Sequence, residues 1–191
     1  STTSTAVQGM PFSKPGAPSI TSAVGNGTAG SANITWKTPA NNGAAISKVE
    51  VLKDSTVIAT YEGSTLTTAM TTANQSPTAT VTGLTNATAN TVKVRVYNAA
   101  GYTESGTASV TPYSKAGQPT NVTAAPNGKN GELVVSWTTP VNNGSAITKI
   151  EIINTLNNNA VRKTIDTSNN ATEWNSSMYT AGSSATTTVS G

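Results

Sequence analysis

Apolar and polar residues alternate with a period of two in several short stretches of this chain. A strand buried on one face has this period, because its successive side chains point to opposite sides. The clearest such stretches are residues 32–36, 49–51, 78–82 and 92–96. Asn-Gly pairs and prolines separate them, and no stretch has apolar residues at helical spacing with caps. Short strands and turns recurring every 8–12 residues or so predict an all-β fold, a β-sandwich.

The phase of the alternation predicts which side chains form the core. One face of the strands carries Ile34, Trp36, Val49, Val51, Val81, Val92, Val94 and Val96. The charged residues Glu50, Lys93 and Arg95 occupy the other phase. We therefore expect the apolar set to be buried. The three charged side chains should form a solvated cross-strand cluster worth less than about 1 kcal/mol per pair.

The whole pattern occurs twice, with an offset of 101 residues that places Trp36 over Trp137. Residues 11–18 align with 112–119, and residues 34–46 align with 135–147. A period of this length is too long for a solenoid repeat that needs its neighbours for stability. It is typical of a domain that folds alone, so the chain is predicted to be a tandem array.

These residues resemble the fibronectin type III family in its bacterial and phage form. The likeness lies in the order and spacing of 18–20, 34–36, 38–43, 46–51, 81–84 and 92–101, which match strands A, B, C, E and F and their loops. The resemblance implies tandem seven-stranded, immunoglobulin-like sandwiches with Trp36 and Trp137 in their cores. One position departs from the family: Asn90 stands where a tyrosine usually closes the corner between strands E and F.

The repeat also predicts the domain organisation. Residues 1–12 align with the end of the first repeat and are interpreted as the last strand of an upstream repeat or an N-terminal arm. Residues 13–113 are expected to form a complete domain, and residues 114–191 a second one lacking strands F and G. Strand C of the second domain, with Ile150 and Ile152, should then have an apolar open edge. We expect the natural polypeptide to extend beyond both ends.

Composition narrows the function further. The chain has no Cys and no His, which removes disulfides, thiolate nucleophiles and the commonest general base. Its two Asp and six Glu are scattered, with no pair suited to acid–base catalysis or to a hard cation. Eleven Lys and Arg form no basic stripe for a nucleic acid, and no apolar run could span a bilayer. We therefore expect a non-enzyme with no catalytic, cofactor-binding or metal-binding residues and with neither nucleic acid nor membrane as a partner.

Three local features could suggest a binding site. Residues 25–30 spell G-x-G-x-x-G, but a strand follows where a dinucleotide site needs a helix, so a hairpin turn is predicted. The loops 41–43 and 142–144 could hold a cation or a sugar through amide oxygens, but Asn and Gly serve positive-φ turns equally well. Tyr102, in the loop after strand F, is a candidate contact residue.

The expected function rests on the family resemblance and remains open between three settings. The first is a non-catalytic structural or display module on a phage virion surface, in a capsid decoration, tail or fibre protein. Its partners would be other virion structural proteins or copies of itself, with a host-surface glycan as a candidate ligand. The alternatives are a spacer or adhesive repeat of a bacterial cell-surface protein, and an accessory segment of a secreted polysaccharide-degrading enzyme. The location would then be the cell surface or the extracellular space.

Overall fold

The computed structural model describes residues 9–190, which divide into two units between Tyr113 and Ser114. We call the described residues up to Tyr113 unit 1 and those from Ser114 unit 2. In the part of the chain that is described, no helix is long and apolar enough to cross a membrane.

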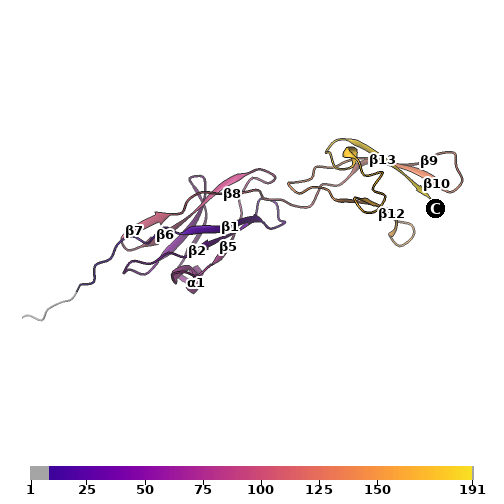
Figure 1. The fold of residues 1–191 in the computed structure, drawn as a ribbon. Helices are drawn as coiled ribbons and strands as arrows, with labels where there is room; N and C mark the ends of the chain where they lie inside the picture. Colours follow the sequence, from indigo (N-terminus) through magenta and orange to yellow (C-terminus); the bar gives the residue numbers. More distant parts are fainter. Residues whose placement is uncertain (1–8, 191) are drawn as a thin grey trace, which may run out of the picture. The chain divides into compact units, whose positions relative to one another are not determined.

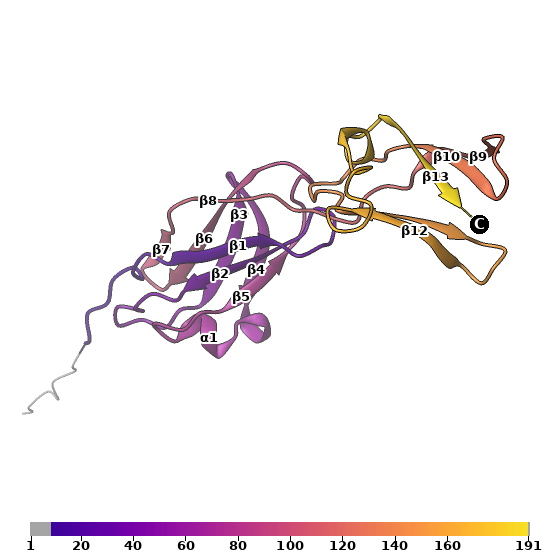
Figure 2. The same cartoon turned by 45° about the vertical axis from the view of Figure 1, so that its right-hand side comes forward.

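Unit 1 is a sandwich of two antiparallel sheets (Figure 1). The first sheet has the order β1-β2-β5, formed by β1 (Ser19–Gly25), β2 (Ala32–Lys37) and β5 (Thr78–Val81). The second has the order β4-β3-β6-β7, formed by β4 (Thr56–Glu62), β3 (Lys48–Lys53), β6 (Asn90–Asn98) and β7 (Gly101–Glu104). A further strand, β8 (Ala108–Val110), pairs with the first half of β6. Figure 2 shows β3 and β4 behind the β1-β2-β5 sheet.

The core of unit 1 lies between the two sheets, and its membership confirms the predicted phase. All eight apolar residues expected inside are at most 1% exposed, with Trp36 at 0%. Lys93, one position out of phase, is only partly buried. The strand register is therefore the one that the alternation predicts.

Unit 1 also contains helical turns that the alternation does not predict. A 3-10 turn, η1 (Gly63–Thr65), and a single α-helical turn, α1 (Thr68–Thr71), connect β4 to β5. The turn places Met70 in the core, where it is 3% exposed, and the Thr38 hydroxyl donates to the Ala69 carbonyl at 2.7 Å. The expectation of strands and turns alone is wrong for this connection. Between β4 and β5 the chain passes from one sheet to the other, and one helical turn there covers the core.

The corner before β6 is closed by Asn90 in place of the missing tyrosine. Its side-chain oxygen accepts from the Thr85 amide at 2.8 Å. Its amide nitrogen donates to the carbonyls of Thr85 and Thr88 at 2.9 and 2.7 Å. Since Asn90 is only 4% exposed, these bonds hold the Thr85–Asn90 loop without help from solvent.

We expect Asn90→Ala to lower the free energy of unfolding of unit 1 by about 1–3 kcal/mol, because it leaves buried backbone groups without partners. Urea unfolding followed by amide hydrogen exchange in unit 1 measures this loss. Thr91→Ala, at the neighbouring exposed position, is the matched control and should change stability by less than about 0.5 kcal/mol. Equal effects of the two substitutions would show that the corner does not depend on the Asn90 amide.

Unit 2 repeats the first part of this fold. One sheet has the order β9-β10-β13, formed by β9 (Thr120–Pro126), β10 (Glu132–Thr138) and β13 (Ser184–Ser190). The other is a hairpin of β11 (Lys149–Asn154) and β12 (Ala160–Asp166), and a 3-10 turn, η2 (Ser176–Met178), precedes β13. Trp137 is 4% exposed in a smaller core that includes Ile165 and Met178.

Within the described residues β11 pairs with β12 alone, whereas its counterpart β3 pairs with strands on both sides. The side of β11 that corresponds to the β6 side of β3 is thus unpaired within residues 9–190. As for the segment interpreted as an upstream strand or arm, residues 1–8 lie outside the described residues, and residues 9–12 form no strand.

Candidate functional site

A group of interacting charged and aromatic side chains lies on the outer face of the second sheet of unit 1. We call it the β3–β6–β7 cluster; it comprises Lys48, Glu50, Lys93, Arg95, Tyr97, Tyr102 and Glu104. The strand register brings its members together, because Glu50 lies opposite Arg95 and Arg95 lies opposite Glu104. Tyr97 likewise lies opposite both Lys48 and Tyr102. Residues of one phase on three adjacent strands therefore share one face.

Glu50 is the enclosed member of this cluster. It is 7% exposed, and its carboxylate accepts from the Lys48 ammonium at 2.8 Å, the Tyr97 hydroxyl at 2.8 Å and Arg95 at 3.3 Å. The expectation that Glu50 is solvated is thus wrong. The cross-strand side chains of β6 cover the carboxylate, which the alternation along β3 alone cannot reveal.

Arg95 connects Glu50 to the edge strand β7. Its guanidinium donates to one carboxylate oxygen of Glu104 at 2.6 and 2.9 Å, and it lies 4.5 Å from the centre of the Tyr102 ring. Lys93, expected beside Glu50, instead pairs with Glu104 at 3.2 Å. Hydrogen bonds to Glu104 and Tyr97 raise the pKa of Arg95, so it stays charged.

The two carboxylates of the cluster are held in their ionised form. Burial by itself raises the pKa of Glu50. The hydrogen bonds from Lys48 and Tyr97 and the charges of Lys48 and Arg95 together lower this pKa by more than burial raises it. The net pKa of Glu50 therefore lies below the ordinary glutamate value. Hydrogen bonds from Arg95 and Lys93 lower the pKa of Glu104 in the same direction.

The stability of unit 1 should therefore fall in acid. A carboxyl whose pKa is lower in the folded than in the unfolded chain favours folding fully above its unfolded pKa, about 4.3 for Glu. This contribution is lost as the pH falls through the lower folded pKa. Urea midpoints of unit 1 between pH 7 and pH 2 should show the loss, and the double variant Glu50→Gln, Glu104→Gln should show a smaller one. An unchanged pH profile in the variant would contradict the assignment.

The charged groups of the β3–β6–β7 cluster are paired with one another. Its two carboxylates both engage cations, and each cation engages a carboxylate. Across residues 9–190 no three Asp or Glu side chains gather where they could hold a metal ion. The arrangement can stiffen a sheet and offer a partly exposed ring, Tyr102, at 46% exposure.

The other sequence candidates occupy turns. Residues 25–30 connect β1 to the antiparallel β2 with Gly27 and Gly30 at positive φ, which confirms the hairpin turn. Asn42 and Asn143 also have positive φ, as turn residues require. Tyr102, the candidate contact residue, lies in β7, and its ring centre is 5.1 Å from that of Tyr97.

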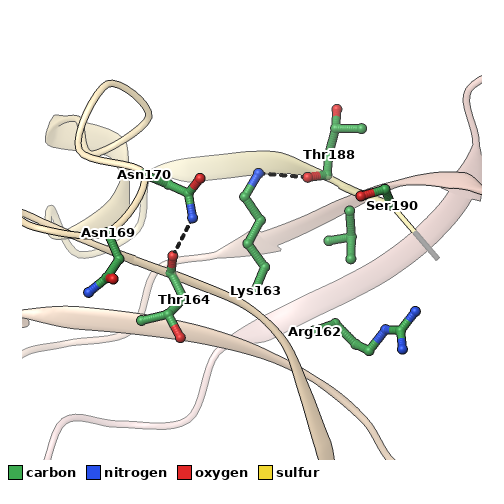
Figure 3. Close-up of a pocket in the computed structure, with 8 residues that line it drawn as sticks. Arg162, Lys163, Thr164, Asn169, Asn170, Thr188 and Ser190 are labelled. Atoms are coloured by element: carbon green, nitrogen blue, oxygen red, sulfur yellow. Dashed lines mark hydrogen bonds between the residues drawn. The ribbon is translucent and has the colours of Figure 1, made fainter.

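Unit 2 has a polar surface cavity of about 400 Å³ between β12 and β13 (Figure 3). The Lys163 ammonium donates to the Thr188 carbonyl at 2.7 Å and pairs with Glu173 at 2.6 Å, and the Asn170 amide donates to the Thr164 carbonyl at 2.7 Å. The Lys163–Thr188 bond joins the two sheets, and the other two contacts join β12 to the loop that follows it. They stabilise the lining of the cavity and leave Arg162 as its remaining cation.

Sequence reasoning missed the residues that organise the β3–β6–β7 cluster: Lys48, Tyr97 and Glu104. Lys48 and Tyr97 share the phase of Glu50 and Arg95 on their strands, so the period of two could have found them. Glu104 lies on the short strand β7, whose four residues are too few for a clear alternation.

Comparison with known proteins gives one family. The model of the Fibronectin type III domain matches residues 16–111. No curated protein sequence matches the chain. Among solved structures, the FN1–FN3 domains of chicken CNTN1 are similar, with 14% sequence identity and a TM-score of 0.39. That match covers 93% of this chain and 56% of the other.

Proposed function

Because this chain belongs to the fibronectin type III family, we propose that it is a non-catalytic structural module displayed on the surface of a virion, in a capsid decoration, tail or fibre protein. In this role each sandwich acts as a spacer that is joined head to tail to the next. The observation that carries the proposal is the path of the chain through unit 1.

The chain approaches β1 at one end of the unit 1 sandwich. There the Ser13 amide donates to the Asn42 carbonyl at 3.1 Å, and the Asn42 side chain donates to the Lys14 carbonyl at 2.8 Å. The Asn98 side chain donates to the Ser13 carbonyl at 2.7 Å. The loop 41–43 that receives the chain follows the end of β2.

The chain leaves unit 1 at the opposite end, beside the loop that precedes β2. The Ala87 amide donates to the Pro112 carbonyl at 2.8 Å, and the Tyr113 ring lies against Gly25. A sandwich whose two chain ends lie at opposite ends of its strands can be joined to others in a row. This geometry suits a spacer in a row of domains. A domain inserted into a loop of another domain would have both of its chain ends at the same end.

Unit 2 receives its own N-terminal segment through the same contacts. The Ser114 amide donates to the Asn143 carbonyl at 3.0 Å, and the Asn143 side chain donates to the Lys115 carbonyl at 2.7 Å. Asn42 and Asn143 are equivalent residues of the two repeats. The same pair of hydrogen bonds, made by Asn42 in unit 1 and by Asn143 in unit 2, thus holds the N-terminal segment of each module. This repetition supports a repeated spacer.

The composition of the chain agrees with display at high local density. Charged residues make up 10% of the chain, against about 25% in an ordinary soluble domain, so Thr, Ser and Asn provide most of the polar surface. Neither the β3–β6–β7 cluster nor the unit 2 cavity carries a nucleophile with an adjacent base. This supports a module that positions other parts of a protein and performs no reaction.

The role of the Asn42 side chain in holding the N-terminal segment can be tested with Asn42→Gly. Glycine keeps the positive φ but removes the side-chain bond to the Lys14 carbonyl, so amide exchange at residues 13–16 should accelerate about tenfold while the core strands stay protected. Thr21→Gly, in β1, is the control and should destabilise the sandwich without selectively freeing this segment. Unchanged exchange at Ser13 and Gly16 would show that Asn42 does not hold the segment.

The virion assignment is tested by locating the chain in its source. Immunogold labelling with antibodies raised against the purified chain should mark particles at their capsid, tail or fibres. Label on cell envelopes or in the secreted fraction would contradict the virion setting and favour a cell-surface or enzyme-associated spacer. Turnover of a glycan or a peptide by the purified chain would contradict the non-catalytic role, whereas binding alone would not.

A further inference from the structure

A single carboxylate connects the two sheets of unit 2 on the side where β12 and β13 face each other. We call residues 167–175, which follow β12, the strap. Glu173 lies in the strap, and its carboxylate accepts from the Lys163 ammonium of β12 at 2.6 Å and from the Thr187 hydroxyl of β13. The same ammonium donates to the Thr188 carbonyl at 2.7 Å (Figure 3). Because β12 and β13 belong to different sheets, Glu173 fastens the strap to both.

Unit 1 closes the same side without any charge. The strand registers identify the equivalent positions: Lys163 corresponds to Ala59, and Thr187 corresponds to Ala79. Ala79 is 2% exposed in the core of unit 1, and Ala59 packs against that core. Two apolar residues in unit 1 are thus replaced in unit 2 by residues that bind a carboxylate.

The bridge holds an aromatic residue of the strap against the core of unit 2. Thr187 is 4% exposed, and the side chains of Lys163 and Glu173 are 14% and 36% exposed. The next residue, Trp174, packs against the core cluster, and its ring centre lies 5.6 Å from that of Tyr179. Loss of the bridge would therefore free the part of the strap that covers the core.

The charged groups around Glu173 are few. Lys163 is its ion-pair partner on β12, and Arg162 lines the cavity on the same side of the unit. Asp166, just before the strap, accepts instead from the amides of Ser168 and Asn169. In the sequence, 167–190 contains no Asp, Glu, Lys or Arg other than Glu173, so neither η2 nor β13 contributes a charge.

From this geometry we propose that the strap is a closure of unit 2 that acid releases. Protonation of Glu173 removes the negative charge that Lys163 pairs with, the bridge between the sheets breaks, and the strap detaches from the core. The two sheets remain paired, because their backbone ladders do not involve the strap. The inference goes beyond the proposed spacer role, which requires no moving part.

The direction of the pH dependence follows from the contacts of Glu173. Hydrogen bonds from Lys163 and Thr187 lower the pKa of Glu173 in the closed strap. A carboxyl whose pKa is lower in the closed than in the open state favours closure fully above its open-state pKa, about 4.3 for Glu. This contribution is lost as the pH falls through the lower value of the closed state. The strap should therefore be closed at pH 7 and open in acid.

The emission of Trp174 reports the release. The difference between the fluorescence of the 191-residue chain and that of its Trp174→Phe variant gives the spectrum of Trp174. This spectrum should shift to longer wavelength between pH 7 and pH 2, because the ring leaves the core for water. Trp36 and Trp137, which are the emitters in the Trp174→Phe chain, should keep their emission until the units themselves unfold.

Two variants test the role of Glu173. Glu173→Gln removes the charge, so at pH 7 amide exchange at residues 171–175 should accelerate about tenfold, and the acid shift of Trp174 should become smaller. The double variant Lys163→Met, Glu173→Leu provides an apolar contact in place of the bridge, as the alanines do in unit 1. It should keep the strap closed at every pH at which unit 2 is folded.

Asp166→Asn is the matched control, because Asp166 is the other carboxyl whose pKa the strap lowers, through its hydrogen bonds from Asn169 and Ser168. This variant should keep the acid shift of Trp174. If Asp166→Asn removed the shift and Glu173→Gln left it intact, the sensing group would be Asp166 and the proposal would be wrong.

Two further results would overturn the proposal. The first is a Trp174 spectrum that changes neither in acid nor in Glu173→Gln, since the bridge would then not hold the strap. The second is a shift of Trp174 that always coincides with a change in Trp137, since unit 2 would then unfold as a whole. Neither result concerns the hydrogen bonds of Asn42, so the spacer role is judged separately.

Discussion

Trp36→Ala is expected to remove about 3–5 kcal/mol from the free energy of unfolding of unit 1, the largest effect of any single substitution considered. Trp36 is fully buried at the centre of a core that both sheets share. Its truncation removes apolar surface from the core and leaves a cavity that the paired strands cannot close. Hydrogen exchange with mass spectrometry in rising urea measures this for β2, β3 and β6.

Unit 2 is the internal reference in this experiment. Its core cluster is distinct from that of unit 1, so its exchange should not change in the Trp36→Ala chain. Lys37→Ala, at the exposed end of β2, should change the stability of unit 1 by less than about 0.5 kcal/mol. Loss of protection in both units together would contradict independent folding.

Arg95→Met should have the second largest effect, a loss of about 2–3 kcal/mol from the free energy of unfolding of unit 1. The substitution leaves the enclosed carboxylate of Glu50 and that of Glu104 without their shared cation. The double variant Glu50→Leu, Arg95→Met should recover most of the loss. With leucine at position 50, the buried carboxylate that would lack its cation is no longer present. Urea unfolding at pH 7 measures both variants.

Arg162→Met is the matched control for this substitution. Arg162 is exposed in unit 2 and forms no ion pair with a described residue, so its replacement should be nearly neutral. If Arg95→Met were equally neutral, the β3–β6–β7 cluster would be ordinary solvated surface, as the alternation alone suggested.

Several elements of unit 1 could not be foreseen, for identifiable reasons. The edge strand β4 is mostly exposed or half-buried, so its sequence shows no strict alternation. The turn α1 has four residues, which is too short for a helical period and too short to be stable without its contacts in the core. The role of Asn90 depends on the loop that it closes, and a single amide in a sequence gives no sign of the carbonyls that it meets.

The sequence by itself determined β2, β3, β5 and β6 of unit 1, their phase and the repeat that relates the two units. These features are local, because burial of one face imposes a period of two on any half-buried strand. The tertiary structure alone decided the enclosure of Glu50 and the pairing of Lys93 with Glu104. Each of these depends on which strands lie side by side. Pairing joins residues such as Glu50 and Arg95 that are distant in sequence, and a one-dimensional pattern does not record it.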